Sequence, residues 1–272
     1  MNQHRPHKKN IFLESLCLGA GLWFFFLATS LWAKPRVAID AAHGGSEPGA
    51  KSGNVVEKEW NQKVAQSIAT AIEAAGMDAV LIRKKDETIT QEKRDELINT
   101  AQVSLVLVIH ADREWTGVLK GPFLVVEPPN KNEAPAASDI QKWGVVSPGE
   151  YRQSLKLARS IAAKLGIGSE LSSLSDSRGG YGESPAEDGR IFCLPHQSLR
   201  NLLPPSVVLT PMFLTSASDR KDFSDSGFLD SFAAKVAEGV RDFIMPASAV
   251  TAPASAETPV TPVAPEPTAT PN

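Results

Sequence analysis

Residues 37–45 read Val37-Ala38-Ile39-Asp40-Ala41-Ala42-His43-Gly44-Gly45. The apolar run at 36–40 predicts a short buried strand, and Gly44 and Gly45 let the backbone turn tightly beside His43. The following segment carries apolar residues at helical spacing and then a glycine. These residues are Trp60, Val64, Ile68, Ile72 and Ala75, followed by Gly76. A buried strand, a tight turn and an amphipathic helix therefore open the fold.

The alternation of strand and helix continues as far as residue 245. Further strands are predicted at 79–83, 104–109, 123–127 and 207–209, and further helices at 90–101, 149–165 and 228–244. This pattern predicts an α/β fold, with a single domain built on a mostly parallel twisted central sheet and helices on both faces. The stretch 166–205 lacks periodicity, so we expect a long irregular segment that is either functional or mobile.

The N-terminal segment predicts export. Three basic residues precede an apolar run at 11–32 that only Glu14 interrupts. A positive flank before an apolar run is typical of a segment that the export machinery reads. Two alternatives stay open: residues 1–33 are a signal peptide cleaved after Ala33, or residues 11–32 remain as an anchor in the cytoplasmic membrane. Either alternative places the rest of the chain in the periplasm or cell envelope.

The remaining chain divides into a domain at 34–245 and a tail at 246–272. The tail is rich in Pro, Ala and Thr and has no aromatic residue, so we expect it to be disordered. The formal net charge is −3, and no Lys/Arg cluster stands out beyond the first nine residues. A nucleic-acid partner is therefore not expected.

Two of the three histidines that follow the apolar run come directly after predicted strands. His43 follows the first strand and His110 follows the strand at 104–109, while Glu57 begins the helix that contains Trp60. Ligands bind at the carboxyl ends of strands in open α/β sheets. Two imidazoles and one carboxylate form a catalytic type of zinc site, with a position left for water or substrate. A histidine at a strand end also suits a structural role, so this spacing alone does not decide between them.

Several segments together resemble the zinc-dependent N-acetylmuramoyl-L-alanine amidases, which are cell-wall enzymes. They occur in the family's order and span about residues 36–245. The matching segments are 37–45 with Pro48-Gly49-Ala50, Glu57-Lys58 with Asn61, Leu81-Ile82-Arg83 with Asp86, Arg94 with Asn99, and Val108-Ile109-His110-Ala111-Asp112.

The resemblance implies a hydrolase that cuts the amide between N-acetylmuramic acid and the L-alanine of the stem peptide. It implies that His43, Glu57 and His110 bind a zinc ion (Zn²⁺). Arg83 and Asp112, which stand in two of the motifs, are predicted to bind the substrate. The expected partners are peptidoglycan or muropeptides, and the membrane if residues 11–32 are an anchor.

One position departs from the family pattern. The segment Pro205-Ser206-Val207-Val208-Leu209-Thr210-Pro211-Met212-Phe213-Leu214-Thr215-Ser216 resembles the family's last core strand. Thr210 occupies the place of the glutamate that serves as general base. A threonine hydroxyl is not a base near neutral pH, and losing a general base costs ~10²–10⁴-fold in rate. No catalytic residue is therefore assigned, and the candidate substitutes are His196 and Glu183.

Three functions remain compatible with the sequence. The first is an active amidase with a displaced proton carrier. The second is a catalytically impaired pseudo-amidase that binds peptidoglycan or regulates a true amidase, which Thr210 would explain. The third is a metal-dependent hydrolase that acts on another amide of the cell envelope.

Overall fold

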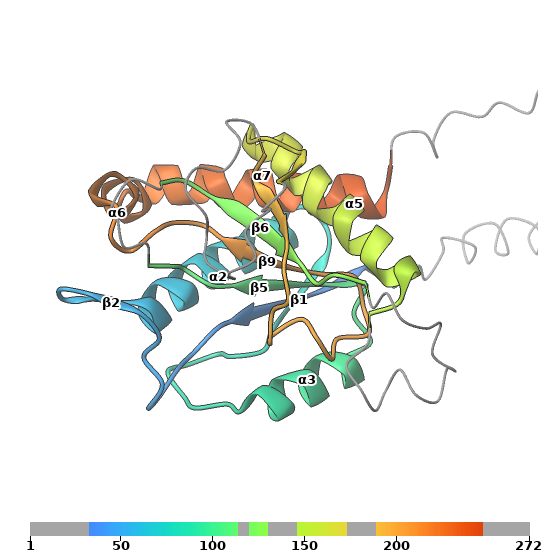
Figure 1. Ribbon diagram of the computed structural model, residues 1–272, viewed down its shortest axis with the longest axis horizontal. Helices are drawn as coiled ribbons and strands as arrows, with labels where there is room; N and C mark the ends of the chain where they lie inside the picture. Colours follow the sequence, from blue (N-terminus) through green and yellow to red (C-terminus); the bar gives the residue numbers. More distant parts are fainter. Residues whose placement is uncertain (1–32, 114–119, 130–145, 173–188, 247–272) are drawn as a thin grey trace, which may run out of the picture. The chain divides into compact units, whose positions relative to one another are not determined.

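The computed structural model describes residues 33–113, 120–129, 146–172 and 189–246 (Figure 1). The chain divides into two units, Met1–Lys34 and Pro35–Asn272, and the elements below belong to the second. The expected signal or anchor segment and the tail after residue 246 lie outside the described residues. Within the described residues, no helix is both long and apolar enough to span a membrane.

Seven of the described strands form a central sheet with a single change of direction. Its order is β4-β1-β5-β9-β6-β8-β7. The strands are β1 (Arg36–Ala41), β4 (Asp78–Leu81), β5 (Leu105–Ile109), β6 (Phe123–Val126), β7 (Leu171–Ser172), β8 (Ile191–Cys193) and β9 (Ser206–Thr210). Neighbours are parallel except β6 and β9, which run antiparallel. The predicted mostly parallel α/β sheet is confirmed.

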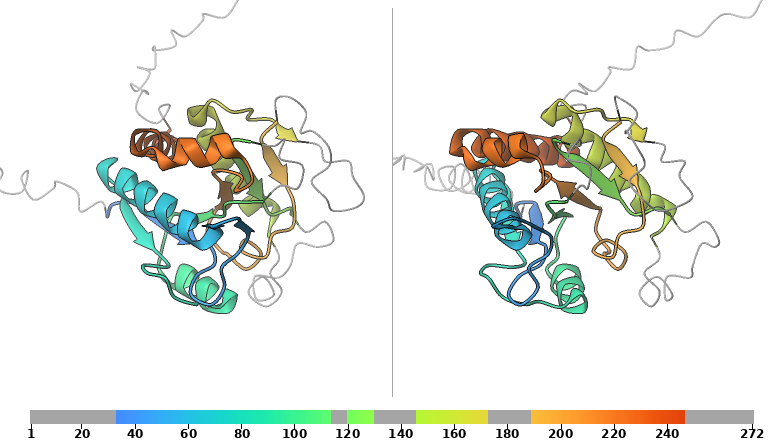
Figure 2. Two further views of the ribbon diagram at one scale, coloured as in Figure 1. Left: turned by 90° about the vertical axis from the view of Figure 1, so that its left-hand side faces the viewer. Right: turned by 60° about the vertical axis from the view of Figure 1, so that its left-hand side comes forward.

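Helices cover both faces of this sheet, as predicted. They are α2 (Glu57–Ala74), α3 (Gln91–Thr100), α5 (Pro148–Leu165), α6 (Ala217–Ser224) and α7 (Ser226–Ile244). Alternate residues of a strand point to opposite faces. Val37 and Ile39 of β1 therefore join the core with α2, α5 and α7, whereas Ala38 joins a second core with Ile98 of α3. The two sides are visible with α5 and α7 opposite α3 (Figures 1 and 2).

The stretch 166–205 is less irregular than the sequence predicts. It contributes β7 and β8, which extend the sheet beyond β6. These strands have two and three residues, which is too short for a recognisable period. The hairpin of β2 (Lys51–Ser52) and β3 (Val55–Val56) was missed for the same reason.

The start of α2 is held by backbone instead of by a capping side chain. Its N-cap residue, Val56, makes no side-chain cap. The first N–H groups of a helix lack partners within the helix. Here Glu57 N–H donates to the Ala50 carbonyl at 3.0 Å, and Lys58 N–H donates to the Pro48 carbonyl at 3.2 Å. The segment that contains Gly49 is thus fixed against the start of α2.

A buried ion pair holds α3 to the sheet. Arg94 of α3 pairs with Asp40 of β1, and both side chains are nearly inaccessible to solvent. Burial raises the pKa of Asp40, and the adjacent Arg94 guanidinium opposes that rise. Arg94 also donates to the Ala41 carbonyl at 3.1 Å and to the His43 carbonyl at 2.7 Å. One side chain therefore joins α3 to the end of β1.

We expect Arg94→Met to lower the free energy of unfolding by about 3–5 kcal/mol, because it leaves the Asp40 carboxyl buried without its cation. Urea denaturation of the full chain measures this loss. The matched control is Lys93→Ala, which removes the neighbouring exposed ion pair with Glu96 and should cost about 0–1 kcal/mol. Equal losses of unfolding free energy in the two variants would contradict the stabilising role of the buried Arg94–Asp40 pair.

Candidate metal centre

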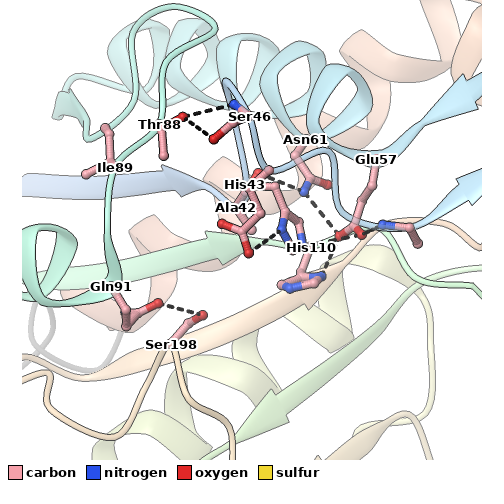
Figure 3. Close-up of polar contacts among 12 residues, drawn as sticks. Ala42, His43, Ser46, Glu57, Asn61, Thr88, Ile89, Gln91, His110 and Ser198 are labelled. Carbon is pink, nitrogen blue, oxygen red and sulfur yellow. Dashed lines mark hydrogen bonds and ion pairs between the residues drawn. The ribbon is translucent and has the colours of Figure 1, made fainter.

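Three predicted ligands meet where β1 and β5 end and α2 begins. His43 follows β1, His110 follows β5, and Glu57 is the first residue of α2. The strands are parallel and pair Ala41 with Ile109, so their carboxyl ends lie at one edge of the sheet. One ligand atom from each of the three residues lies within 4.8 Å of the others (Figure 3). The structure therefore brings the three predicted ligands together, and their binding of a metal stays a prediction.

The carboxylate of Glu57 lies between the two imidazoles. Its Oε1 is 2.5 Å from His110 Nδ1, and its Oε2 is 3.4 Å from His43 Nε2. The two rings are nearly perpendicular, with centroids 4.7 Å apart. Burial alone would raise the pKa of Glu57, but the imidazoles of His110 and His43 outweigh burial and lower it to about 2. Glu57 is therefore ionised near neutral pH and is available as an anionic ligand.

The ring nitrogens of His43 test whether these residues suit a metal. Both Nδ1 and Nε2 are buried, and neither makes a hydrogen bond within the described part of the chain. Buried polar atoms normally have partners, because an unpaired one loses its contact with water without replacement. A cation that accepts a nitrogen lone pair would satisfy His43. Two imidazoles and one carboxylate are the donor set that zinc prefers, so the residues fit a zinc ion.

The backbone at His43 adopts a conformation that non-glycine residues rarely take. Its φ is 63°, in the left-handed region, where a non-glycine residue costs about 1–3 kcal/mol. Arg94 holds this turn by its bond to the His43 carbonyl. On the other side, Gly49 lies so close that an added Cβ would be 2.5 Å from His43 Cδ2 and 2.6 Å from Glu57 Oε2. Gly49 therefore leaves room for the ligands.

A second set of contacts fixes the turn after His43. Asp86 accepts from Gly45 N–H at 2.7 Å and from Lys58 Nζ at 2.7 Å, and Lys58 also donates to the Gly45 carbonyl at 2.8 Å. The Lys58 ammonium beside Asp86 lowers the pKa of that carboxyl. Ser46 contacts Thr88 through its backbone N–H and its hydroxyl (Figure 3). The loop that follows β4 thus holds the turn that follows β1.

Arg83, which the sequence predicts to bind substrate, lies buried against backbone, and the predicted contact with substrate stays a prediction. Its side chain is 1% exposed, and its guanidinium donates to the carbonyls of Ala41, Lys58 and Lys85 at 3.0, 2.8 and 3.3 Å. These donors are occupied by backbone, and Arg83 supports the segments that carry His43 and Glu57.

Asp112 follows His110 by two residues, and its backbone groups and one carboxylate oxygen are hydrogen-bonded to the backbone of other residues. Its N–H donates to the Met212 carbonyl at 3.1 Å, and its carbonyl accepts from Leu214 N–H at 2.7 Å. Its Oδ1 also accepts from Arg113 N–H at 2.6 Å. These bonds join the segment after β5 to the segment after β9. The predicted contact between Asp112 and substrate stays a prediction.

Thr210 lies beside His110 in the sheet. It is the last residue of β9 and is 2% exposed. The β5–β9 register pairs Ile109 with Leu209, and His110 N–H donates to the Leu209 carbonyl at 3.2 Å, so the next pair brings His110 next to Thr210. On its other side, Thr210 pairs with Phe123 of β6. A buried hydroxyl therefore stands next to a predicted ligand.

His196 approaches the predicted ligands from the segment after β8. Its ring centroid is 5.5 Å from that of His110, in an edge-on arrangement. Its Nδ1 accepts from Ser198 N–H at 3.3 Å. Burial and the charge of His110 lower the pKa of His196 to about 4. Glu183, the other candidate substitute, lies outside the described residues.

A cavity of about 420 Å³ opens beside the ligands. Its wall includes His43, His110, His196, Gln91, Arg94 and Ser198. Ser198 Oγ donates to Gln91 Oε1 at 3.5 Å (Figure 3), and both residues line the cavity. The polar wall provides hydrogen-bonding groups around a space that can admit part of a larger polar molecule.

Comparison with protein families gives one match over most of this unit. The sequence model of the N-acetylmuramoyl-L-alanine amidase family matches residues 37–242. The probable N-acetylmuramoyl-L-alanine amidase AmiB of Haemophilus influenzae is 34% identical over 98 residues, which are 34% of this chain and 23% of that protein. N-acetylmuramoyl-L-alanine amidase LytC of Bacillus subtilis is 24% identical over 203 residues, covering 75% of this chain. The match spans 34% of LytC, so the chain covers well under two thirds of either relative.

Solved structures share the fold. The CwlD amidase of Clostridioides difficile, solved in complex with the GerS lipoprotein, superposes with a TM-score of 0.56 at 18% identity and covers 77% of this chain and 98% of its own. Ami1 of Mycobacterium smegmatis, an N-acetylmuramyl-L-alanine amidase, superposes with a TM-score of 0.58 at 14% identity and covers 77% of this chain and 96% of its own. At these identities the likeness supports the α/β fold.

We expect Gly49→Ala to weaken zinc binding by about tenfold or more, because the new methyl group would displace His43 or Glu57. The matched control is Gly53→Ala. Both glycines have positive φ, 69° and 60°, but an added Cβ at Gly53 meets nothing within 4 Å. Both variants therefore share the backbone strain. Competition titration with a chromophoric chelator measures the zinc affinity of each, and the difference between them reports the displacement of the ligands alone. Equal zinc affinities in the two variants would rule out the proposed role of Gly49.

Proposed function

The chain belongs to the N-acetylmuramoyl-L-alanine amidase family, and on this premise we propose that it is a zinc-dependent hydrolase of peptidoglycan. The bond cut is the amide between N-acetylmuramic acid and the L-alanine of the stem peptide. The observation that carries the proposal is the cluster of His43, Glu57 and His110, in which the two inaccessible ring nitrogens of the half-buried His43 lack a hydrogen bond. We further propose that the chain acts outside the cytoplasm, which the apolar segment at 11–32 supports.

His43, Glu57 and His110 are the residues that would hold the zinc ion. When bound, zinc polarises a carbonyl oxygen and makes water a stronger nucleophile near neutral pH. Glu57 supplies the one negative charge of the ligand set, and its low pKa keeps it ionised. Gly49 and the strained turn at His43 keep the ligands close together. The cavity beside them would receive the amide and its flanking groups.

The proton transfers need a group other than Thr210. A hydroxyl has no basicity near neutral pH, and Thr210 is buried beside His110. His196 lies on the cavity wall with its ring edge-on to His110. Because its Nδ1 accepts from Ser198 N–H, the neutral ring carries its proton on Nε2. Nε2 is then a donor, so we assign His196 the hydrogen bond to the oxygen of the reacting amide, and we assign the proton transfers to none of the described residues.

The zinc-loaded full chain should release stem peptides from purified peptidoglycan, and His43→Ala should abolish the release. Mass spectrometry identifies the product, since cleavage at the proposed bond leaves L-alanine as the peptide's N-terminus. Another product would indicate a different envelope amide. Thr210→Glu is assayed alongside, because a restored general base is worth ~10²–10⁴-fold. Release by Thr210→Glu but not by the wild type would support the alternative, a pseudo-amidase that binds peptidoglycan or regulates a true amidase.

We expect His196→Ala to lower kcat by about 10²–10³-fold, the usual loss for one donor to a developing oxyanion. His196→Gln should retain part of the rate, because its amide N–H₂ can still donate. Steady-state kinetics on a soluble muropeptide separates kcat from KM, and the zinc content of each variant checks that the ligands are intact. An unchanged kcat in His196→Ala would exclude the residue from the reaction.

A further inference from the structure

Asn61 is a fully buried amide that touches every segment carrying a predicted ligand. It lies on α2, one turn after Glu57, and is 0% exposed. Its Nδ2 donates to the Ala42 carbonyl at 3.2 Å and to Glu57 Oε1 at 3.3 Å. Its Oδ1 accepts from Ala111 N–H at 2.7 Å. Ala42 precedes His43 and Ala111 follows His110, so one side chain contacts the neighbours of both histidines and the carboxylate itself. Figure 3 shows Asn61 beside Ala42 and Glu57.

The partners of Asn61 fix which way its amide points. Ala111 offers an N–H, which only the amide oxygen can accept, and Ala42 offers a carbonyl, to which only the amide nitrogen can donate. Turning the amide over would place donor against donor and acceptor against acceptor. The N–H₂ group is therefore held toward Glu57. No other natural side chain of this size has one acceptor and two donors in this arrangement.

We propose that Asn61 is the positioning residue of the metal centre: it sets the orientation of Glu57 and the separation of His43 and His110. This inference rests on the zinc site of the proposed function. The donor from Asn61 reaches Oε1 of Glu57, while Oε2 accepts from Ala50 N–H at 2.7 Å. The carboxylate thus receives one N–H on each oxygen, which limits its rotation toward the histidines. Groups that orient the ligands of a metal in this way commonly control its affinity.

Asn61→Leu tests this role, because leucine has a similar size but neither donates nor accepts. We expect zinc to bind about 10- to 100-fold more weakly, the usual effect of losing a group that orients a ligand. The probe is zinc alone, titrated against a chromophoric chelator with the full chain, at a temperature far below the melting point of both variants. Hydrolysis is not the readout, so the result does not depend on the reaction.

The matched control is Asn99→Leu. Asn99 makes a similar bridge away from the ligands: its Nδ2 donates to the Asn201 carbonyl at 2.8 Å, and its Oδ1 accepts from Leu203 N–H at 3.0 Å. Both variants lose an amide that ties a helix to backbone, so both should melt at a lower temperature. Only Asn61→Leu should lose zinc affinity. Should Asn61→Leu fail to fold, Asn61→Ala enters the same titration with the same expectation.

The zinc titrations of the wild type and of the two variants test the metal centre and the role of Asn61 separately. If the wild type binds no zinc, the metal centre and the role of Asn61 both fall. If the wild type binds zinc and the Asn61 variant binds it within twofold of the wild type, the metal centre stands and the positioning role is wrong. Equal losses of affinity in the Asn61 and Asn99 variants would also overturn it, since a general loosening of the fold would then explain both.

Discussion

The buried charge of Glu57 is the constraint on which the rest of the site depends. An ionised carboxylate removed from water is costly unless other groups compensate it. At 2% exposure, Glu57 has an imidazole near each oxygen and receives N–H groups from Asn61 and Ala50. These partners come from four separate segments of the chain. The sheet, the start of α2 and the loop at 48–50 must therefore meet in one arrangement for the carboxylate to be tolerated.

Two buried arginines maintain that arrangement through backbone carbonyls. Arg94 joins α3 to Asp40 and to the carbonyls at Ala41 and His43. Arg83 joins the end of β4 to the carbonyls of Ala41 and Lys58. Strand ends expose carbonyl groups that have no partner in the sheet, and the planar guanidinium can serve several of them at once. The positive φ of His43 persists because its carbonyl is held on this side and Gly49 leaves space on the other.

The sequence predicts the longer strands and helices, which show a hydrophobic period, and the polar residues that follow the ends of strands. The central strands β1 and β5 carry buried apolar runs and end just before His43 and His110, so the fold could be predicted from the pattern. The ligand role of the two histidines came from the resemblance to the amidase family and stays a prediction. Strands as short as β7 and β8 show no period, and their place in the sheet depends on tertiary pairing with β6. The backbone contacts of Arg83 could not be predicted, because a motif does not say whether a guanidinium meets solvent or backbone. The role of Asn61 requires knowing that β1 and β5 are neighbours.

Thr210, which the sequence places at the family's glutamate position, lies in surroundings that suit a neutral side chain. Thr210 shares a sheet face with Val208 and pairs with Phe123, and Phe123 packs against Phe192 and Phe213. A carboxylate beside such apolar groups would have a raised pKa, whereas a hydroxyl is neutral there. On the proposed mechanism, His196, which lies on the segment after β8, donates a hydrogen bond to the reacting amide. Glu127 anchors that segment by accepting from the His196 backbone N–H at 2.5 Å, so the position of His196 depends on a contact between two loop segments.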